Sequence, residues 1–154
     1  MPELDTADDI VLPALLRHAR SAYAHAIRRR LHSSGYDDLP RNGAYVLGGM
    51  VNHDGSPADL IRQLRVSKQA ASQLVDTLVL RGYLERTTDP DDRRRTVLTA
   101  TERGEGAASE VRAGVLEVDA ELEKRLKPAG VKALRAGLVA LLDINDGYEA
   151  GAPG

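Results

Sequence analysis

Apolar residues recur at helical spacing in several segments of this chain, and the first segment lies near the N-terminus. Over residues 9–31 they fall three or four positions apart, which predicts a long amphipathic helix. Thr6 is its candidate N-cap, with Asp9 as an acidic partner three residues later, and Gly35 is its candidate stop. The apolar stripe consists of Leu12, Leu15, Leu16, Ala19, Ala22, Tyr23, Ala26 and Ile27.

Two shorter helices follow, and each has a recognisable start signal. Pro40, a favoured first-turn residue, begins a helix that we expect to end near Val51, before a turn-prone run. The next helix begins at residues 56–59, where a serine cap, a first-turn proline and an aspartate at the third helical position follow one another. This helix is short and ends at Leu64.

A tight turn over residues 65–67 joins this short helix to another one. Ser67 is placed to cap a helix over residues 68–81, and Gly82 supplies a left-handed stop. Two helices joined by so short a turn are typical of a helix-turn-helix.

The segment after this pair has the pattern of a β-hairpin. Residues 83–88 and 95–100 are predicted strands, and an Asp/Pro-rich turn joins them. Arg93, Arg94 and Arg95 lie at this turn. Exposed arginines on a tight turn suit a narrow DNA groove, where negative potential is concentrated. The order helix, turn, helix, basic hairpin therefore predicts a winged helix.

The C-terminal third of the chain is predicted to be helical. Thr101 caps a long helix over about 102–126, and Pro128 begins a last helix. Residues 145–154 are rich in Gly, Pro and Ala, so we expect a frayed tail. The two helices carry apolar stripes, formed by Ala108, Val111, Val115, Val118 and Leu122 and by Val131, Leu134, Leu138 and Leu141.

Composition bounds the class of protein. A chain of 154 residues, 42% hydrophobic and 29% charged, is expected to form a single globular domain. Its apolar runs fall short of the ~20 residues that span a bilayer, and its acidic start lacks a signal-peptide pattern. We therefore expect a cytoplasmic protein without membrane contact. The absence of cysteine excludes disulfides and thiolate metal sites.

The charge is unevenly distributed, although the formal net charge is only −2. Basic residues outnumber acidic ones over residues 62–95, and acidic residues outnumber basic ones over 105–125. A nucleic acid responds to the local field of a basic face rather than to the molecular total. The distribution predicts one DNA-facing side.

The helix over 68–81 has an apolar and a polar face. Ala71, Leu74, Val75 and Leu78 form the expected buried side. A polar outer face is usually only solvated, but the second helix of such a pair places its N-terminal half in the major groove. Glutamine can read adenine there, and serine can bind a base or a phosphate. The candidate contacts are Ser67, Lys68, Gln69, Ser72 and Gln73.

Asp92 lies between the acidic turn and the arginines of the hairpin. We expect Asp92 to pair with Arg94 or Arg95, which stiffens the tip and orients a guanidinium toward the minor groove. Such an exposed pair contributes little to stability by itself. The candidate wing contacts are Asp92, Arg93, Arg94 and Arg95.

The middle of the chain resembles the MarR family of bacterial transcriptional regulators. The resemblance rests on the order of elements, on Leu64-Arg65-Val66-Ser67, on Arg81-Gly82-Tyr83-Leu84-Glu85-Arg86, and on Asp89-Pro90-Asp91-Asp92-Arg93-Arg94. Thr101 and Gly104 match the family's Leu-Thr-x-x-Gly, with Ala100 in place of the leucine. The specific resemblance covers about residues 57–104.

The resemblance implies a mainly α fold with a small β-hairpin wing. A winged helix-turn-helix lobe covers about residues 38–101, and a helical dimerisation lobe is built from about 6–34 and 102–146 of a single domain, 1–154. The apolar stripes of the terminal helices favour a homodimer independently, with burial inside one domain as the alternative. A twofold dimer reads two inverted half-sites of double-stranded DNA, ~34–36 Å apart.

The resemblance also implies a small-molecule effector. Many members of the family release DNA when a small aromatic or phenolic acid binds between the two lobes. Tyr23, Arg29, Tyr36, Tyr45 and Met50 lie on segments that border such a crevice. Ordinary packing is the alternative for each of these side chains.

Three histidines, His18, His25 and His32, recur every seven residues in the first helix. Neighbouring members are ~10.5 Å apart along a helix, too far to share one metal ion. Surface or interface histidines are the favoured interpretation, with a metal site completed by His53 or a partner helix as the alternative. No nucleophile elbow, phosphate loop or zinc-protease signature is present, so we expect neither enzyme activity nor a cofactor.

Two function classes follow from these patterns. The first is a dimeric, sequence-specific transcriptional regulator, a repressor released by a small-molecule effector. The second is a ligand-sensing or protein-interaction module whose winged helix contacts another protein.

Overall fold

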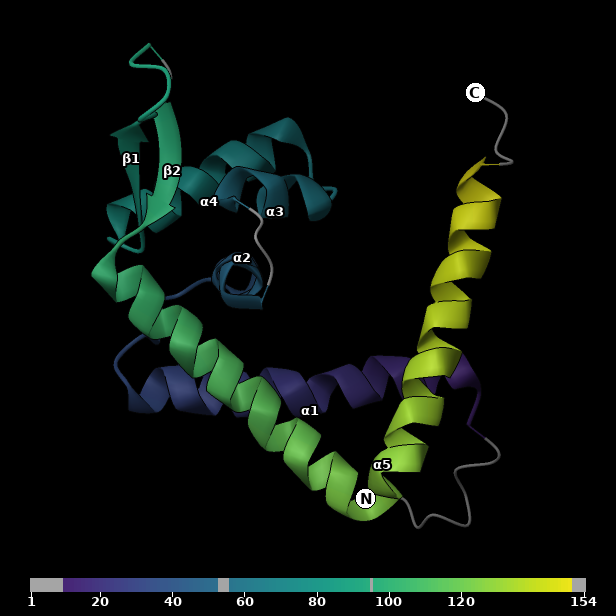
Figure 1. The fold of residues 1–154 in the computed structure, drawn as a ribbon. Coiled ribbons are helices and arrows are strands. Elements are labelled where there is room, and N and C mark those ends of the chain that lie inside the picture. Colours follow the sequence, from purple (N-terminus) through teal and green to yellow (C-terminus); the bar gives the residue numbers. More distant parts are fainter. Residues whose placement is uncertain (1–9, 53–55, 95, 151–154) are drawn as a thin grey trace. The chain divides into compact units, whose positions relative to one another are not determined.

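The computed structural model describes residues 10–52, 56–94 and 96–150, and it divides into two compact units, Met1–Leu116 and Glu117–Gly154. We describe each unit by itself (Figure 1). The elements are α1 (Leu12–Ser33), α2 (Arg41–Asn52), α3 (Pro57–Gln63), α4 (Lys68–Leu80), β1 (Leu84–Thr88), β2 (Thr96–Ala100) and α5 (Glu102–Ala150). This mainly helical fold with one two-stranded sheet confirms the predicted class.

Helix α1 begins later than predicted. Its N-cap is Val11, which makes no side-chain capping bond, and a proline lies in its first turn. A proline lacks an N–H and has a fixed φ, so it is well suited to begin a helix without a polar cap. The predicted cap, Thr6, and its partner Asp9 lie outside the described residues. The helix ends at Ser33, and Gly35 follows at φ 78°.

Helix α3 is fixed at its start by a reciprocal cap. The Ser56 hydroxyl accepts the Asp59 N–H at 3.2 Å, and the Asp59 carboxylate accepts the Ser56 N–H at 3.3 Å. Both bonds satisfy backbone N–H groups that the helix itself cannot pair. The turn after the helix places Arg65 at φ 51°.

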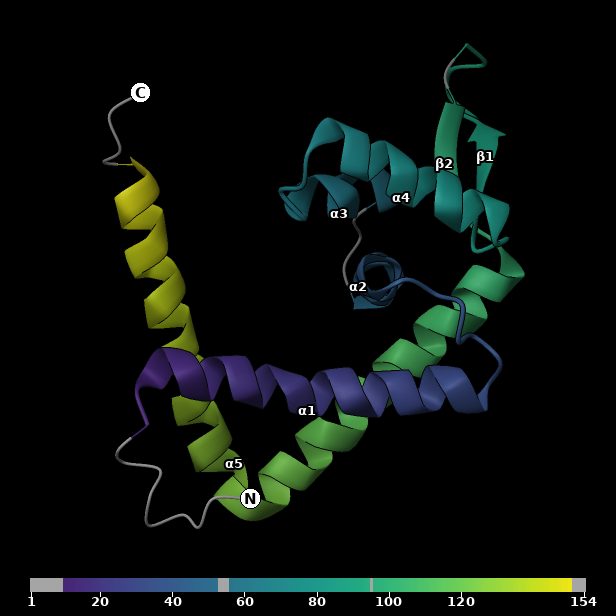
Figure 2. The same cartoon turned by 180° about the vertical axis from the view of Figure 1, so that it is seen from behind.

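Helix α4 has the predicted signals at both ends. Ser67 caps it by accepting the Ala70 N–H at 3.2 Å. After Leu80 the chain turns at Gly82, whose φ of 72° is a conformation that glycine adopts without steric cost. Figures 1 and 2 show α3 and α4 together, with the β1–β2 hairpin extending beyond them.

One hydrophobic core holds the first unit together. Val46 and Leu47 of α2, Leu78 of α4, and Tyr83 and Leu84 at the start of the hairpin are its most buried large side chains. The core also includes Leu31, Leu60, Ile61, Leu74, Ala107, Ala108 and Val111. It therefore joins the predicted winged-helix elements to α1 and to the first turns of α5.

This core corrects part of the predicted dimer stripe. Ala108 and Val111 are buried within their own chain, so they need no second copy to cover them. Gly114, one turn further on, faces the backbone of Ile27 in α1. A stripe at helical spacing identifies a buried face but not the molecule that covers it.

Helix α5 contains the predicted break near Pro128. Lys127 has φ 59° and ψ 164°, so the helical path is interrupted just before the proline. The predicted frayed tail from residue 145 is wrong in part, because the helix continues to Ala150. Within the described part of the chain, no helix is long and apolar enough to cross a membrane.

Candidate nucleic-acid interface

The outer face of α4 is polar and accessible. Lys68, Gln69, Ser72 and Gln73 are all exposed, whereas Leu74 on the opposite side is buried. This arrangement has the predicted faces, with Leu78 fully buried and Ala71 and Val75 half-buried. The helix therefore presents two amides, a hydroxyl and an ammonium group along its first two turns.

Ser67 caps α4 and is also exposed to solvent. Its oxygen accepts the Ala70 N–H, which leaves its hydroxyl hydrogen available to donate. A phosphate oxygen is a suitable acceptor for that hydrogen, and the free N–H groups of a helix start attract the same anion.

The hairpin carries Arg93 and Arg94 at its tip. Its antiparallel register runs from Leu84 opposite Ala100 to Thr88 opposite Thr96. Both arginines are exposed, and Arg95 lies outside the described residues. The tip thus presents at least two cations beyond the last paired residues of the sheet.

The expected side-chain pair between Asp92 and Arg94 is replaced by another bond. The Asp92 carboxylate accepts the backbone N–H of Arg94 at 3.0 Å, and Asp89 accepts the backbone N–H of Asp91 at 2.9 Å. Aspartate commonly forms such turns with the residue two positions on. The alternative pair with Arg95 lies outside the described residues.

An ion pair joins α4 to the hairpin. Arg86 of β1 donates to Asp76 of α4 at 2.8 Å. Sequence reasoning missed this pair, because the two residues belong to different elements. Both side chains are exposed, so the pair contributes little to stability, and it orients the strand relative to the helix.

A second set of contacts lies where the hairpin meets α5. We define the Arg103 cluster as Tyr36, Asp38, Tyr83 and Arg103. Arg103 donates to the Asp38 carboxylate at 3.0 Å and to the Tyr83 hydroxyl at 3.1 Å, and Tyr83 donates to Asp38. The Arg103 guanidinium also lies 4.7 Å from the ring centroid of Tyr83 and 5.4 Å from that of Tyr36.

The burial of Tyr83 and the hydrogen bonds around it set the charge states of this cluster. Tyr83 is 0% exposed, and this burial, together with its bond to Asp38, raises its pKa to about 12. The hydrogen bond from Tyr83 and the positive charge of Arg103 lower the pKa of Asp38, against the effect of desolvation. At neutral pH the cluster therefore holds a neutral tyrosine, a carboxylate and a guanidinium, each in its hydrogen-bonding form.

Thr101 and Gly104 explain why α5 can approach the hairpin so closely. The Thr101 hydroxyl accepts the Gly104 N–H at 3.0 Å and donates to the Gly82 carbonyl. A Cβ at Gly104 would overlap the carbonyl oxygen of Tyr83. The Thr-x-x-Gly spacing was visible in the sequence, and it was the available signal for this contact.

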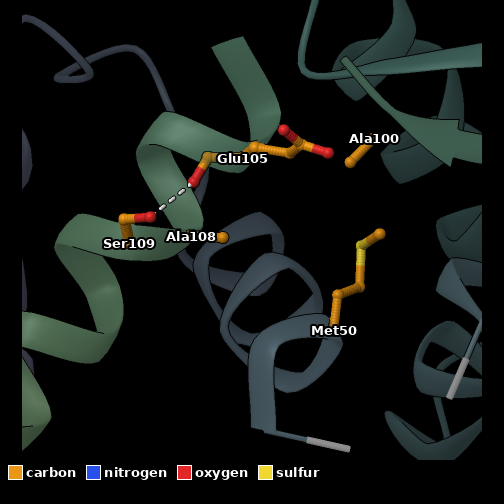
Figure 3. A pocket seen from close by; sticks show the side chains of 5 residues that line it. All are labelled: Met50, Ala100, Glu105, Ala108 and Ser109. Atoms are coloured by element: carbon orange, nitrogen blue, oxygen red, sulfur yellow. Dashed lines mark hydrogen bonds between the residues drawn. The ribbon is translucent and has the colours of Figure 1, made fainter. Parts of the chain in front are cut away.

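A pocket of about 320 Å³ opens beside the first turns of α5. Its walls come from α2, the end of β2 and α5, and Figure 3 shows Met50 and Glu105 extending into the space near Ala100. Ala108 and Ser109 complete the lining, and the Ser109 hydroxyl donates to the Glu105 carbonyl oxygen at 3.0 Å. Glu105 supplies the ionisable side chain of this wall.

Comparison with known proteins relates the middle of this chain to one family. A sequence model of the MarR family matches residues 37–95. The transcriptional repressor MprA of Escherichia coli K12 is 29% identical over 103 residues, which are 67% of this chain and 58% of MprA. The middle of the chain is therefore similar to MarR-family regulators. It matches little more than half the length of MprA.

Solved structures, among them MarR of E. coli, share the fold of this chain. The reduced form of MarR from E. coli has a TM-score of 0.63 and 24% identity, over 86% of this chain and 97% of that one. MepR of S. aureus bound to ethidium bromide has a TM-score of 0.59 and 19% identity, over 88% of this chain and 97% of MepR. At such identities the structures support the fold alone.

The predicted effector residues do not gather around the pocket. Met50 lines it, but Tyr36 belongs to the Arg103 cluster and Tyr45 is 50% exposed on α2. Tyr23 and Arg29 lie on α1 and are not among the lining residues. Effector binding by these side chains stays a prediction.

The histidine series lies along α1. His18, His25 and His32 are exposed, and His53 falls outside the described residues. Among the described residues, no group of three metal-binding side chains is close enough to hold an ion. A site completed by a partner helix stays a prediction.

Proposed function

We propose that this protein is a dimeric, sequence-specific regulator that binds double-stranded DNA. The observation that carries the proposal is the exposed polar face of α4 together with a hairpin tip that carries Arg93 and Arg94. The Asp76–Arg86 ion pair joins α4 to the hairpin. A helix and an arginine-bearing hairpin in one compact unit can enter adjacent grooves of one duplex. The role is binding rather than catalysis, and it belongs in the cytoplasm, where bacterial DNA is found.

The proposed contacts divide into base-reading and phosphate-binding groups. Gln69 and Gln73 have the donor and acceptor pair that matches adenine in the major groove, and Ser72 can serve several bases. Ser67 and Lys68 at the start of α4 contact phosphate. In the wing, Asp92 shapes the tip, and Arg93, Arg94 and Arg95 contact the minor groove.

The proposed DNA-binding unit is a dimer of two copies of the chain. The last turns of α5 carry exposed apolar side chains, of which Leu134, Leu138 and Leu141 are 42%, 39% and 37% exposed. These residues form a second stripe at helical spacing, which suits burial against a partner copy. Two copies then read inverted half-sites. Repression by promoter occlusion is the proposed outcome, since the relative MprA is named a transcriptional repressor.

Selection from random duplexes tests the proposed function. The full chain should enrich an inverted repeat, and anisotropy should show tighter binding to it than to competitor DNA. Gln69→Ala and Gln73→Ala should each reduce that preference by about 5- to 150-fold, since one bidentate base contact contributes about 1–3 kcal/mol. Gln63→Ala, on exposed Gln63 at the end of α3, is the matched control. Enrichment of no sequence would contradict the proposal.

The pocket favours a cationic effector over the aromatic acid expected from the sequence. Met50, Ala100 and Ala108 offer apolar walls, whereas Glu105 offers a negative charge. An aromatic acid would place its carboxylate near Glu105, and like charges repel. We therefore propose an apolar ligand with a positive group.

Calorimetric titration with three small probes tests this ligand class. Phenyltrimethylammonium should bind more tightly than its neutral isostere tert-butylbenzene or than benzoate. Glu105→Gln should weaken cation binding by up to about fivefold, because an exposed ion pair contributes about 1 kcal/mol or less. Glu102→Gln changes an exposed carboxylate of the same helix turn that does not line the pocket. Equal losses in both variants would exclude Glu105 as the recognising group.

A protein-interaction module remains the second candidate function. The exposed side chains of α4 and of the hairpin could also meet an acidic protein surface. Duplex binding with a steep dependence on salt separates the two candidates, because phosphate contacts release counterions.

A further inference from the structure

We infer that Arg103 is a positioning residue that transmits occupancy of the Glu105 pocket to the DNA-reading helix α4. The inference rests on the proposed function, because it needs both a DNA-binding surface and a ligand in the pocket. It is carried by the contacts of the Arg103 cluster with α4 on one side and with the pocket wall on the other.

The first step is the attachment of the cluster to the end of α4. Tyr83 donates its backbone N–H to the Leu78 carbonyl at 2.9 Å, so the tyrosine is bonded to the last turn of the helix. Arg81, the C-cap of α4, donates to the carbonyl oxygen of Asp38. Asp38 and Tyr83 therefore move with the C-terminal end of α4.

The second step is the set of contacts that hold α5 against Asp38 and Tyr83. Arg103 bonds to both Asp38 and Tyr83, and its guanidinium faces the rings of Tyr83 and Tyr36. Gly104 packs against the Tyr83 backbone, and a Cβ at Gly106 would overlap the Tyr36 hydroxyl. The first turns of α5 therefore cannot shift without changing the contacts of Arg103.

The third step is the position of the pocket on the same turns. Glu105, two residues after Arg103, lies in the pocket wall, and Ala108 follows it on the helix. Another wall residue, Ala100, pairs in the sheet with Leu84, which is adjacent to Tyr83. A ligand that moves this wall acts on both sides of the Tyr83–Arg103 contact.

Arginine is suited to this role because it combines two kinds of contact. Its planar guanidinium donates several hydrogen bonds and also lies over aromatic rings. Lysine can keep the charge but not the planar geometry. Methionine keeps the length of the side chain and removes both the charge and the donors.

The test is a coupling measurement on the full-length chain. Anisotropy gives the Kd for the selected duplex with and without saturating phenyltrimethylammonium, and the ratio of the two is the coupling factor. We expect about a 5- to 150-fold factor in the wild type, the range typical of linked sites. Arg103→Met should bring the factor close to one, while affinity for the probe in the absence of DNA changes less than about twofold.

Two further variants separate positioning from a general loss of structure. Arg103→Lys should retain part of the coupling, and Tyr83→Phe, which keeps the ring and removes the hydroxyl, should retain part of it as well. Arg112→Met, on an exposed arginine further along α5, should leave the factor unchanged. A purely structural role would lower the melting temperature and weaken both affinities without changing their ratio. If Arg103→Met fails to fold, Arg103→Lys and Tyr83→Phe decide the question.

The outcomes distinguish the inference from the proposals beneath it. An unchanged coupling factor in Arg103→Met, or in both milder variants, overturns the inference while the DNA-binding function stands. A wild type that binds duplex and probe without any coupling overturns it too. If the wild type binds no duplex, both the proposed function and the inference are wrong.

Discussion

Replacing Gly104 by alanine is expected to destabilise the protein by about 1–3 kcal/mol, the usual cost of forcing an extra carbon into a packed contact. The added Cβ meets the backbone carbonyl of Tyr83, and a backbone atom cannot rotate away as a side chain can. The first turn of α5 must therefore shift away from the hairpin. Thermal unfolding followed by circular dichroism should show a midpoint lower by about 3–10 °C.

Gly137 provides the matched control within the same helix. A Cβ there meets nothing within 4 Å, so Gly137→Ala should be neutral or stabilising by up to about 1 kcal/mol through helix propensity. The comparison separates the effect of crowding from the general effect of glycine in a helix. A Gly104→Ala variant as stable as Gly137→Ala would show that the contact with Tyr83 relaxes without cost.

Removing both described wing arginines is expected to weaken operator binding by roughly 10- to 100-fold. Arg93→Ala/Arg94→Ala deletes two exposed cations from the hairpin tip. Each arginine that neutralises a phosphate contributes about 0.9 to the slope of log affinity against log salt, so the slope should fall by about 2. Anisotropy over a salt series measures both quantities.

The control for charge alone is Arg17→Ala/Arg20→Ala, which removes two exposed arginines from α1. It changes the net charge of the protein by the same amount and leaves the wing intact. Unfolding temperatures should stay close to that of the wild type in both double variants, because these side chains are exposed. If the two variants lost the same affinity and slope, the wing would have no special role.

Local signals in the sequence predicted the parts of the fold that local chemistry determines. Ser56 and Asp59 cap α3, Ser67 caps α4, and Gly82 ends α4, because each of these bonds or turns involves residues close together in the chain. The wrong boundaries have similar causes. Val11 begins α1 without a polar cap, and the glycine-rich composition after residue 145 does not interrupt α5.

Contacts between distant segments could not be predicted in the same way. Arg103 and Asp38 are 65 positions apart, and Asp76 and Arg86 belong to different elements, so no spacing rule relates them. The apolar stripe through Ala108 and Val111 was correctly recognised as buried, but the covering surface depends on the path of the whole chain. The pocket around Glu105 likewise needs three elements to meet.

At the Asp92 turn, the path of the backbone does not depend on the charged side chains of the wing. Its carboxylate bonds to a backbone N–H, which every residue except proline can supply, rather than to the side chain of Arg94. Positions 93 and 94 can therefore change during evolution while the tip keeps its path. Related regulators could adapt to operators of different groove width by exchanging these side chains, without rebuilding the hairpin that presents them.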